Sequence, residues 1–310
     1  TIVSESGRAI AAYQSVLVFE AVGRTGDRGA LAGGAGGGPP GGDDAPRPLR
    51  DLRDARASAE AGAPVEALHD ATQARDQAVD LFRLGYLGLE GRAWAERSYA
   101  AVCEAVRDAT RRMEEVPEEL EGIEEILSET YFCNFSIFQS LPDAWAIGQR
   151  FPVMPIHRLD ERPGRRAVLG DMTCDSDGKL DRFSEGRSVG RTLPVHDLRP
   201  GEPYYLAAFL VGAYQEILGD LHNLFGDTHA AHVRADPDGD WWIEELVRGD
   251  TARDVLGYVR YDADRLQPLL ERDCERAMRE GRLTTAESRT LLSFYASALD
   301  ASTYLEPRGP

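Results

Sequence analysis

A glycine-rich stretch, Gly23 to Asp44, divides the chain into parts with different sequence patterns. It consists mostly of Gly, Ala and Asp with one pair of prolines, so it cannot bury enough apolar surface to offset its conformational entropy. We therefore predict a flexible insertion over residues 23–44. Before it, Thr1–Val3 and Val16–Phe19 have the apolar composition of short buried strands, and both belong to an N-terminal segment, residues 1–22.

Helical periodicity follows the insertion. Val65–Leu84 is typical of one helix that ends near Gly85, and Pro117 is placed to begin another. Between them an apolar side chain recurs at alternating steps of three and four, at Tyr99, Val102, Val106, Ala109 and Met113. This is the stripe of an amphipathic helix. We predict an antiparallel helical bundle over residues 45–130, joined by short loops.

Beyond Tyr131 the pattern changes to β-like sequence. Arg166–Met172 and Tyr204–Val211 predict strands, and an Asp-Gly turn before Trp241–Leu246 predicts a hairpin. These elements indicate a β domain at residues 131–250. Helical signals then return and predict a C-terminal helical domain at residues 251–310, with helices at Thr251–Tyr258, Asp264–Glu280 and Thr285–Leu299.

The balance of charge restricts the partners of the chain. Its 310 residues include 53 acidic and 35 basic side chains, which give a net charge of −18. A surface this negative repels phosphate backbones and anionic lipid heads, so we expect neither a nucleic acid nor a membrane as a partner. The longest apolar run, Tyr204 to Tyr214, is about half of the ~20 residues that cross a bilayer.

Four cysteines are scattered along the chain without a Cys-x-x-Cys pair, at Cys103, Cys133, Cys174 and Cys274. This usage is typical of a reducing compartment, and the sequence shows no secretory signal, so we expect a cytoplasmic protein. The sequence also begins without methionine, directly in strand-like residues. We therefore expect it to be part of a longer protein.

Two short polar segments carry groups suited to a binding or catalytic site. In Glu5-Ser6-Gly7-Arg8, glycine lets backbone amides approach an anion and arginine supplies a planar pair of donors for phosphate. An ordinary polar turn is the alternative. In Cys174-Asp175-Ser176-Asp177-Gly178, a thiol and carboxylates lie just past a strand end, where they can transfer protons and bind a cation. A solvated turn is the alternative here. Tyr214 closes the next buried strand, where it can donate to a phosphate or pack as half-buried core.

Metal sites find little support in the sequence. Gly178 is the fourth residue of its acidic segment, whereas a calcium loop needs glycine at the sixth position. The histidines His222, His229 and His232 near Asp227 follow no compact zinc pattern. We assign no metal-binding residue.

Several segments, taken together and in order, closely resemble the biosynthetic arginine decarboxylase family. They are Ser4–Ala9, Asn134–Trp145, Thr173–Gly178, Val211–Gly219, His222–Gly226 and Thr303–Glu306. The resemblance covers nearly the whole chain except the glycine-rich insertion. It implies a pyridoxal-phosphate decarboxylase with an alanine-racemase-like fold, and hence a multidomain α and β structure. The end of a (β/α)8 barrel, with Thr1–Val3 as its last strand, would be followed by a β domain, with an inserted helical bundle and a C-terminal helical domain.

The resemblance also implies roles for the residues that would hold the cofactor, pyridoxal phosphate. Glu5 would pair with the pyridinium nitrogen and keep it protonated, so that the ring can take up the electron pair left when carbon dioxide departs. Gly7 and Arg8 would hold the phosphate, with help from Tyr214. These residues would lie at the C-terminal face of the barrel, where catalytic sites of such barrels are found.

A second set of roles concerns the substrate. Cys174 is similar to the thiol that reprotonates the α-carbon, and Asp175 to the carboxylate that binds the cationic end of the substrate, with Asp177 orienting the guanidinium. In this group the Cys-Asp segment serves the active site of the neighbouring subunit, which implies a homo-oligomer of at least two subunits.

The family resemblance implies decarboxylation of L-arginine to agmatine and CO2 in polyamine synthesis, with Mg2+ whose site the sequence does not locate. The helical insert favours arginine over ornithine, lysine or diaminopimelate. The chain departs from the family at Tyr13-Gln14, where histidines are usual, and the family's Schiff-base lysine lies upstream of Thr1. Lys179, the single lysine, belongs to the Cys174 turn and cannot replace it. We therefore expect the chain to be inactive alone; the alternative is a non-catalytic regulatory or oligomerisation module.

Overall fold

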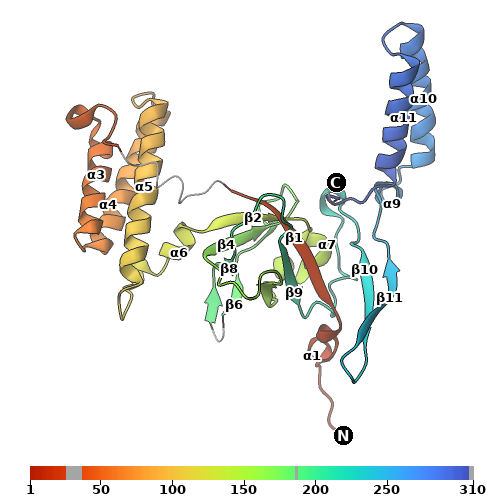
Figure 1. The fold of residues 1–310 in the computed structure, drawn as a ribbon, viewed down its shortest axis with the longest axis horizontal. Helices are drawn as coiled ribbons and strands as arrows, with labels where there is room; N and C mark the ends of the chain where they lie inside the picture. Colours follow the sequence, from red (N-terminus) through yellow and green to blue (C-terminus); the bar gives the residue numbers. More distant parts are fainter. Residues whose placement is uncertain (26–36, 186–187, 307–310) are drawn as a thin grey trace.

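The computed structural model describes residues 1–25, 37–185 and 188–306, in three parts arranged in a row (Figure 1). A helical bundle lies at one end, a seven-stranded sheet in the middle and a helical hairpin at the other end. The middle of the predicted flexible insertion, residues 26–36, lies outside the described residues. Its two ends have structure that the prediction lacked. Gly23 belongs to a strand, and the carbonyl of Gly37 accepts a 3.0 Å hydrogen bond from Nε1 of Trp94 in the bundle.

The bundle is built from three long helices, α3 (Arg47–Glu60), α4 (Pro64–Arg83) and α5 (Leu89–Thr110), preceded by a 3-10 turn, η2 (Gly42–Asp44). Small side chains let the helices approach closely, since α4 presents a buried row of alanines to its neighbours. Leu52, Val102 and Val106 fill the space between them and are fully buried. The predicted helix at Val65–Leu84 and the stripe on α5 are confirmed.

The helix predicted to begin at Pro117 does not form as one continuous element. The chain instead forms a 3-10 turn, η3 (Glu118–Leu120), and a single helical turn, α6 (Ile123–Ile126). Gly122 weakens a helix by about 1 kcal/mol relative to alanine, and glutamates four residues apart repel each other along this segment. Its apolar residues still pack as expected, because Leu120 and Ile123 are buried in the bundle core.

The central sheet is antiparallel except for one parallel pair, β2 with β4. Its strands are β1 (Val16–Arg24), β2 (Glu129–Cys133), β3 (Val153–Pro155), β4 (Arg165–Gly170), β5 (Lys179–Leu180), β8 (Leu193–Val195) and β9 (Tyr205–Phe209). The order is β3-β9-β1-β2-β4, and both β5 and β8 pair with β4. Strand β3 also contacts β8 from the opposite end of the sheet, so the sheet curls towards a closed barrel. A small hairpin, β6 (Phe183–Glu185) with β7 (Ser188–Gly190), lies beside it. The strands predicted at Val16, Arg166 and Tyr204 are confirmed.

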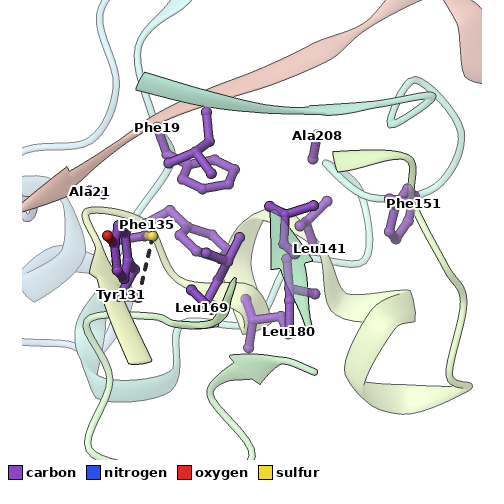
Figure 2. Packing of buried hydrophobic residues seen from close by; sticks show 14 of the residues in the cluster. Phe19, Ala21, Tyr131, Phe135, Leu141, Phe151, Leu169, Leu180 and Ala208 are labelled. Atoms are coloured by element: carbon purple, nitrogen blue, oxygen red, sulfur yellow. Dashed lines mark hydrogen bonds between the residues drawn. The ribbon is translucent and has the colours of Figure 1, made fainter. Parts of the chain in front are cut away.

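Apolar side chains from β1 near the N-terminus, and from the strands and helices between β2 and β9, form one core under this sheet (Figure 2). Phe19 of β1 stacks on Phe135, with ring centroids 4.6 Å apart. Leu141 and Leu169 are fully buried beside them. Phe135 precedes the short helix α7 (Ile137–Ser140), and Leu141 joins α7 to α8 (Pro142–Ala146), so this core holds both helices against the sheet.

The last part of the chain follows the sequence prediction closely. Strand β10 (Ala230–Ala235) pairs with β11 (Trp241–Val247) through the expected turn, in which Gly239 has a φ of +94°. Helices α9 (Ala252–Tyr258), α10 (Ala263–Arg279) and α11 (Thr285–Leu299) follow. Two of them begin with a capping box, on Thr251 and Thr284. In Figure 1, α10 and α11 stand away from the sheet as a hairpin.

The first residues differ from the prediction. Thr1–Val3 forms no strand, and the side chains of Ile2 and Val3 are 97% and 87% exposed. None of the described strands pairs with this segment, so its backbone groups have no ladder to join. Helix α1 (Gly7–Ala11) begins within the Glu5–Arg8 segment, for which an ordinary polar turn was the alternative, and leads into a 3-10 turn, η1 (Ala12–Gln14). No helix in the described residues has the length and apolar character needed to span a membrane.

Candidate functional site

The turn η1, directly after α1, is held against the segment that follows β9 by a close backbone contact. The amide of Gly212 donates to the carbonyl of Ala12 (3.0 Å), and Nε2 of Gln14 donates to the carbonyl of Gly212 (2.9 Å). A side chain at position 212 would lie 2.5 Å from the carbonyl oxygen of Ala11, so only glycine permits this approach. The contact brings the residues after β9 over the start of α1.

Arg8 is fixed by a buried carboxylate from a distant part of the chain. Its Nη2 donates to Oδ2 of Asp143 at 2.7 Å, and Asp143 is 6% exposed at the start of α8. The same oxygen accepts a 2.7 Å hydrogen bond from Nε2 of Gln215, whose Oε1 accepts from the amide of Asp143 at 3.2 Å. The guanidinium therefore has one nitrogen committed to the protein, in a defined orientation.

Tyr214 lies over this arginine. The Cζ of Arg8 is 5.2 Å from the centre of the Tyr214 ring, a cation–π contact. The hydroxyl of Tyr214 points at Gly7, since a Cβ at position 7 would lie 2.8 Å from it. Tyr214 has a φ of +72°, which a non-glycine residue adopts at a cost of order 1–3 kcal/mol. Such strain persists only where the surroundings fix the residue, and it is common at ligand sites.

A cavity of about 440 Å³ opens beside Arg8. Its wall includes Glu5 from the N-terminal segment, Arg150 after α8, and Leu210, which has a φ of +64°. The second terminal nitrogen of Arg8, Nη1, is shielded from solvent and has no hydrogen-bond partner. A buried, charged donor without an acceptor is costly. Arg8 lies on the wall of the cavity, where its positive charge favours an anion.

The second predicted segment forms a separate, hydrogen-bonded loop after β4. The buried carboxylate of Asp171 accepts from the amide and hydroxyl of Thr173 (2.8 and 2.7 Å) and from the amide of Ile137 (2.8 Å). Gly178 packs directly on Asp171 and leaves no room for a side chain. Cys174 itself is exposed, and its amide donates to Oδ1 of Asn223 at 3.1 Å.

Asp175 and Asp177 lie on the same loop. Oδ1 of Asp175 accepts from the amide of Asp177 at 2.9 Å, which closes the turn. The other oxygen of Asp175 is 3.8 Å from Nε2 of His222, at the start of a 3-10 turn, η4 (His222–Leu224). The loop thus presents a thiol and two carboxylates together.

The structure therefore gathers the predicted residues into two groups. Glu5 and Arg8 line the cavity, and Tyr214 packs over Arg8 with its hydroxyl beside Gly7. Cys174, Asp175 and Asp177 lie on the loop after β4. No hydrogen bond or ion pair within the described ranges joins the two groups directly. Sequence reasoning did not identify Asp143, Gln215, Asp171 or Asn223 as site residues. Asp143 and Asn223 are part of the segments that carry the family resemblance, but only the fold shows what they contact.

The histidines do not converge on a metal. The rings of His222 and Phe138 pack at a tilt of 44°, with centroids 4.5 Å apart. Nδ1 of His229 accepts from the amide of Gly249, and His232 lies near Glu245. Among the described residues, no group of three or more His, Cys, Asp or Glu side chains is arranged to hold a metal ion.

Comparison with known proteins identifies the class of protein to which these parts belong. Residues 42–124 match the sequence model of the arginine decarboxylase helical bundle domain, and residues 252–305 match that of the arginine decarboxylase C-terminal helical extension. Both matches fall on helical parts of the structure, the α3–α6 region and the α9–α11 region.

Whole-chain comparisons identify the family within this class. The chain is 47% identical to the biosynthetic arginine decarboxylase of Gloeobacter violaceus, over 98% of this chain and 47% of that protein. It is 48% identical to the enzyme of Nostoc sp., over 98% of this chain and 44% of that protein. The crystal structure of the Campylobacter jejuni biosynthetic arginine decarboxylase superposes with a TM-score of 0.73 at 29% identity, covering 97% of this chain and 47% of that chain. The chain belongs to the biosynthetic arginine decarboxylase family, and it spans about half the length of these relatives.

Proposed function

We propose that the chain is part of an enzyme that decarboxylates L-arginine to agmatine and CO2 with pyridoxal phosphate, in polyamine synthesis. The observation that carries the proposal is Arg8, a cation on the wall of a cavity, held in a fixed orientation by the buried carboxylate of Asp143. An anionic cofactor is the ligand that this arrangement fits. The names of the relatives support arginine as the substrate.

The residues at the cavity fit pyridoxal phosphate. Gly7, Arg8 and Tyr214 would hold its phosphate, because the arginine offers an oriented donor and the glycine leaves room for the tyrosine hydroxyl. Glu5, on the cavity wall, would hold a proton on the ring nitrogen. When bound, the cofactor supplies an electron sink for the pair of electrons left by the departing CO2.

The loop after β4 would act on the substrate. Cys174 has an exposed thiol from which a proton can be delivered to the α-carbon after CO2 leaves. Asp175 would bind the guanidinium of arginine, and Asp177, next along the turn, would orient it. Because no contact joins this loop to the Arg8 group within the described residues, the proposal places it at the cofactor of a neighbouring subunit in a homo-oligomer.

The proposal includes the finer architecture. Residues 1–22 would complete a (β/α)8 barrel and begin the β domain, residues 23–44 would be an insertion, and residues 45–130 the inserted bundle. The β domain and the C-terminal helical domain would divide at about residue 250. Thr1–Val3 would become a strand only beside the other barrel strands. The four free thiols support a cytoplasmic enzyme. Among the described residues no cluster of three or more His, Cys, Asp or Glu side chains offers a site for the Mg2+ that the family resemblance implied, so no residue and no step are assigned to it.

A non-catalytic regulatory or oligomerisation module is the second candidate. Lys179, the single lysine, is 3.3 Å from Asp181 and belongs to the Cys174 loop, so the cavity beside Arg8 has no amine from this chain. A module that kept the fold without catalysis would have the same arrangement.

The cofactor part is tested by comparing pyridoxal phosphate with pyridoxal, which lacks the phosphate, in calorimetric titrations of this chain. Two charge-assisted hydrogen bonds are worth at least about 1.5 kcal/mol, so the phosphate form should bind at least about tenfold more tightly. Arg8→Ala should remove this preference, and the exposed control Arg265→Ala should keep it. Equal affinities in the unmodified chain would refute the phosphate site.

A further inference from the structure

Residues 303–305 lie on the loop that follows η4. The amide of Gly226 donates to Oγ1 of Thr303 at 3.0 Å. The hydroxyl of Tyr304 donates to the carbonyl of Gly226 at 2.8 Å. The rings of Tyr304 and Phe225 stack with centroids 5.1 Å apart. Both backbone groups of Gly226 are thus satisfied by the end of the chain.

Leu305 anchors the same segment to the sheet. The side-chain amide of Asn134 donates to the carbonyl of Leu305 (2.7 Å) and accepts from its amide (3.0 Å). Asn134 directly follows β2, and its own amide donates to the carbonyl of Glu20 in β1 (2.8 Å). Thr303–Leu305 therefore forms a strap that joins the sheet to the loop at Gly226.

This loop also touches the Cys174 loop. Asn223 accepts the hydrogen bond from the amide of Cys174, and His222 faces Asp175. Asn223 and Leu224 have φ values of +57° and +59°, two consecutive non-glycine residues in the left-handed region. Each costs of order 1–3 kcal/mol unless neighbouring contacts hold the conformation. The strap holds the two residues that come next, because Tyr304 stacks on Phe225 and both Thr303 and Tyr304 hydrogen-bond to Gly226.

We infer that the strap Thr303–Leu305 positions the Cys174 loop through Asn223. Tyr304 and Asn223 are positioning residues in this scheme, since neither acts on substrate directly. Burial raises the pKa of Tyr304, so its hydroxyl remains a donor at all physiological pH values. The role in catalysis rests on the proposed function, whereas the physical coupling between strap and loop does not.

Hydrogen exchange of this chain, followed by mass spectrometry, tests the coupling without any decarboxylase activity. Tyr304→Phe leaves the carbonyl of Gly226 without its donor. Exchange over residues 171–178 should become about 5 to 30 times faster, the factor expected for one to two kcal/mol of lost local stability. Tyr261→Phe is the matched control, because Tyr261 is an exposed tyrosine in the same part of the chain, and it should leave these rates unchanged.

Asn223→Gly separates positioning from general loosening. Glycine adopts the left-handed backbone without strain but has no oxygen to accept from Cys174. Exchange over residues 171–178 should accelerate in this variant, while that over residues 303–305 stays at the level of the unmodified chain. Unchanged exchange over 171–178 in both variants would overturn the inference.

The catalytic consequence is measured in a longer polypeptide that joins this chain to the half of its relatives that it does not cover. Tyr304→Phe should lower kcat for arginine by at least fivefold and leave the affinity for pyridoxal phosphate unchanged. If this variant accelerates exchange but keeps kcat, the positioning role is refuted. If the unmodified longer polypeptide releases no CO2 from arginine, the proposed function fails and the coupling is judged by exchange alone.

Discussion

Replacing Asp143 with alanine removes the carboxylate that orients Arg8 at the cavity. The ion pair is 2.7 Å long, and its partners' side chains are 30% and 9% exposed, so it is neither a surface pair nor a fully dry one. Gln215 loses one acceptor but keeps the carbonyl of Ala213 at 2.9 Å. The amide of Asp143 keeps its acceptor on Gln215 in the variant, because that bond does not involve the side chain of residue 143.

The loss of stability follows from these contacts. A hydrogen bond to a charged group contributes about 1.5–3 kcal/mol, and Arg8 can recover part of this by turning to water because its side chain is partly exposed. We expect the free energy of unfolding of the sheet to fall by about 2 kcal/mol. With a urea dependence of about 2 kcal/mol per molar, the unfolding midpoint should fall by about 1 M.

The chain contains its own site-specific probes for this experiment. Cys133 is buried in the sheet, Cys103 in the bundle and Cys274 in the C-terminal hairpin, so labelling of each thiol reports the unfolding of a different part. Burial also raises the pKa of Cys133, which keeps the folded thiol unreactive. Asp143→Ala should lower the urea midpoint for Cys133 and leave the other two unchanged.

Glu161→Ala serves as the control, because it removes a surface ion pair to Arg199 in the same domain, with side chains 40% and 48% exposed. Exposed pairs contribute about 0–1 kcal/mol, so the Cys133 midpoint should barely move. The reasoning is refuted if both variants shift this midpoint equally, or if Asp143→Ala shifts the three cysteines together.

Three further changes test the rest of the structure with the same or related measurements. Leu52→Ala, at a fully buried position of the bundle, should cost about 2–5 kcal/mol and lower the labelling midpoint of Cys103 alone. Gly212→Ala forces a side chain against the backbone of η1 and should cost about 1–3 kcal/mol, seen as a lower midpoint for Cys133. Hydrogen bonds from Thr251 lower the pKa of Asp254 below its ordinary value of 3.8. The ionised carboxylate therefore stabilises the folded α9 fully above pH 3.8, and this stabilisation is lost as the pH falls through the lowered pKa. Asp254→Asn should therefore accelerate hydrogen exchange in α9 at neutral pH and have no effect well below pH 3.8; an equal effect at both pH values would contradict this.

Elements with strong local signals were predictable from sequence. The hairpin at β10–β11 has a turn that needs a glycine, and α9 and α11 begin with capping boxes, so neighbouring residues decide these structures. The structure of the segment after Pro117 was not predictable in this way. Its apolar residues follow a helical pattern, but Gly122 and the repelling glutamates interrupt the helix. Thr1–Val3 has strand-like composition, but a strand also needs a neighbour to pair with.

The candidate site was predictable only in its parts. Glu5–Arg8 and Cys174–Asp177 stand out as compact polar segments with useful chemistry. The partners that position them are remote, since Arg8 is 135 residues from Asp143 and Cys174 is 49 residues from Asn223. Periodicity and spacing carry no information about such pairs, which depend on how β9, α8 and η4 pack around one core.

The most direct test of the central claim is agmatine formation from L-arginine with added pyridoxal phosphate. It compares this chain, a longer polypeptide that restores the uncovered half of the relatives, and the longer polypeptide carrying Cys174→Ala. The account predicts agmatine from the longer form only, with strong loss in the Cys174 variant. Absence of agmatine from the longer form, with pyridoxal phosphate bound, would contradict it.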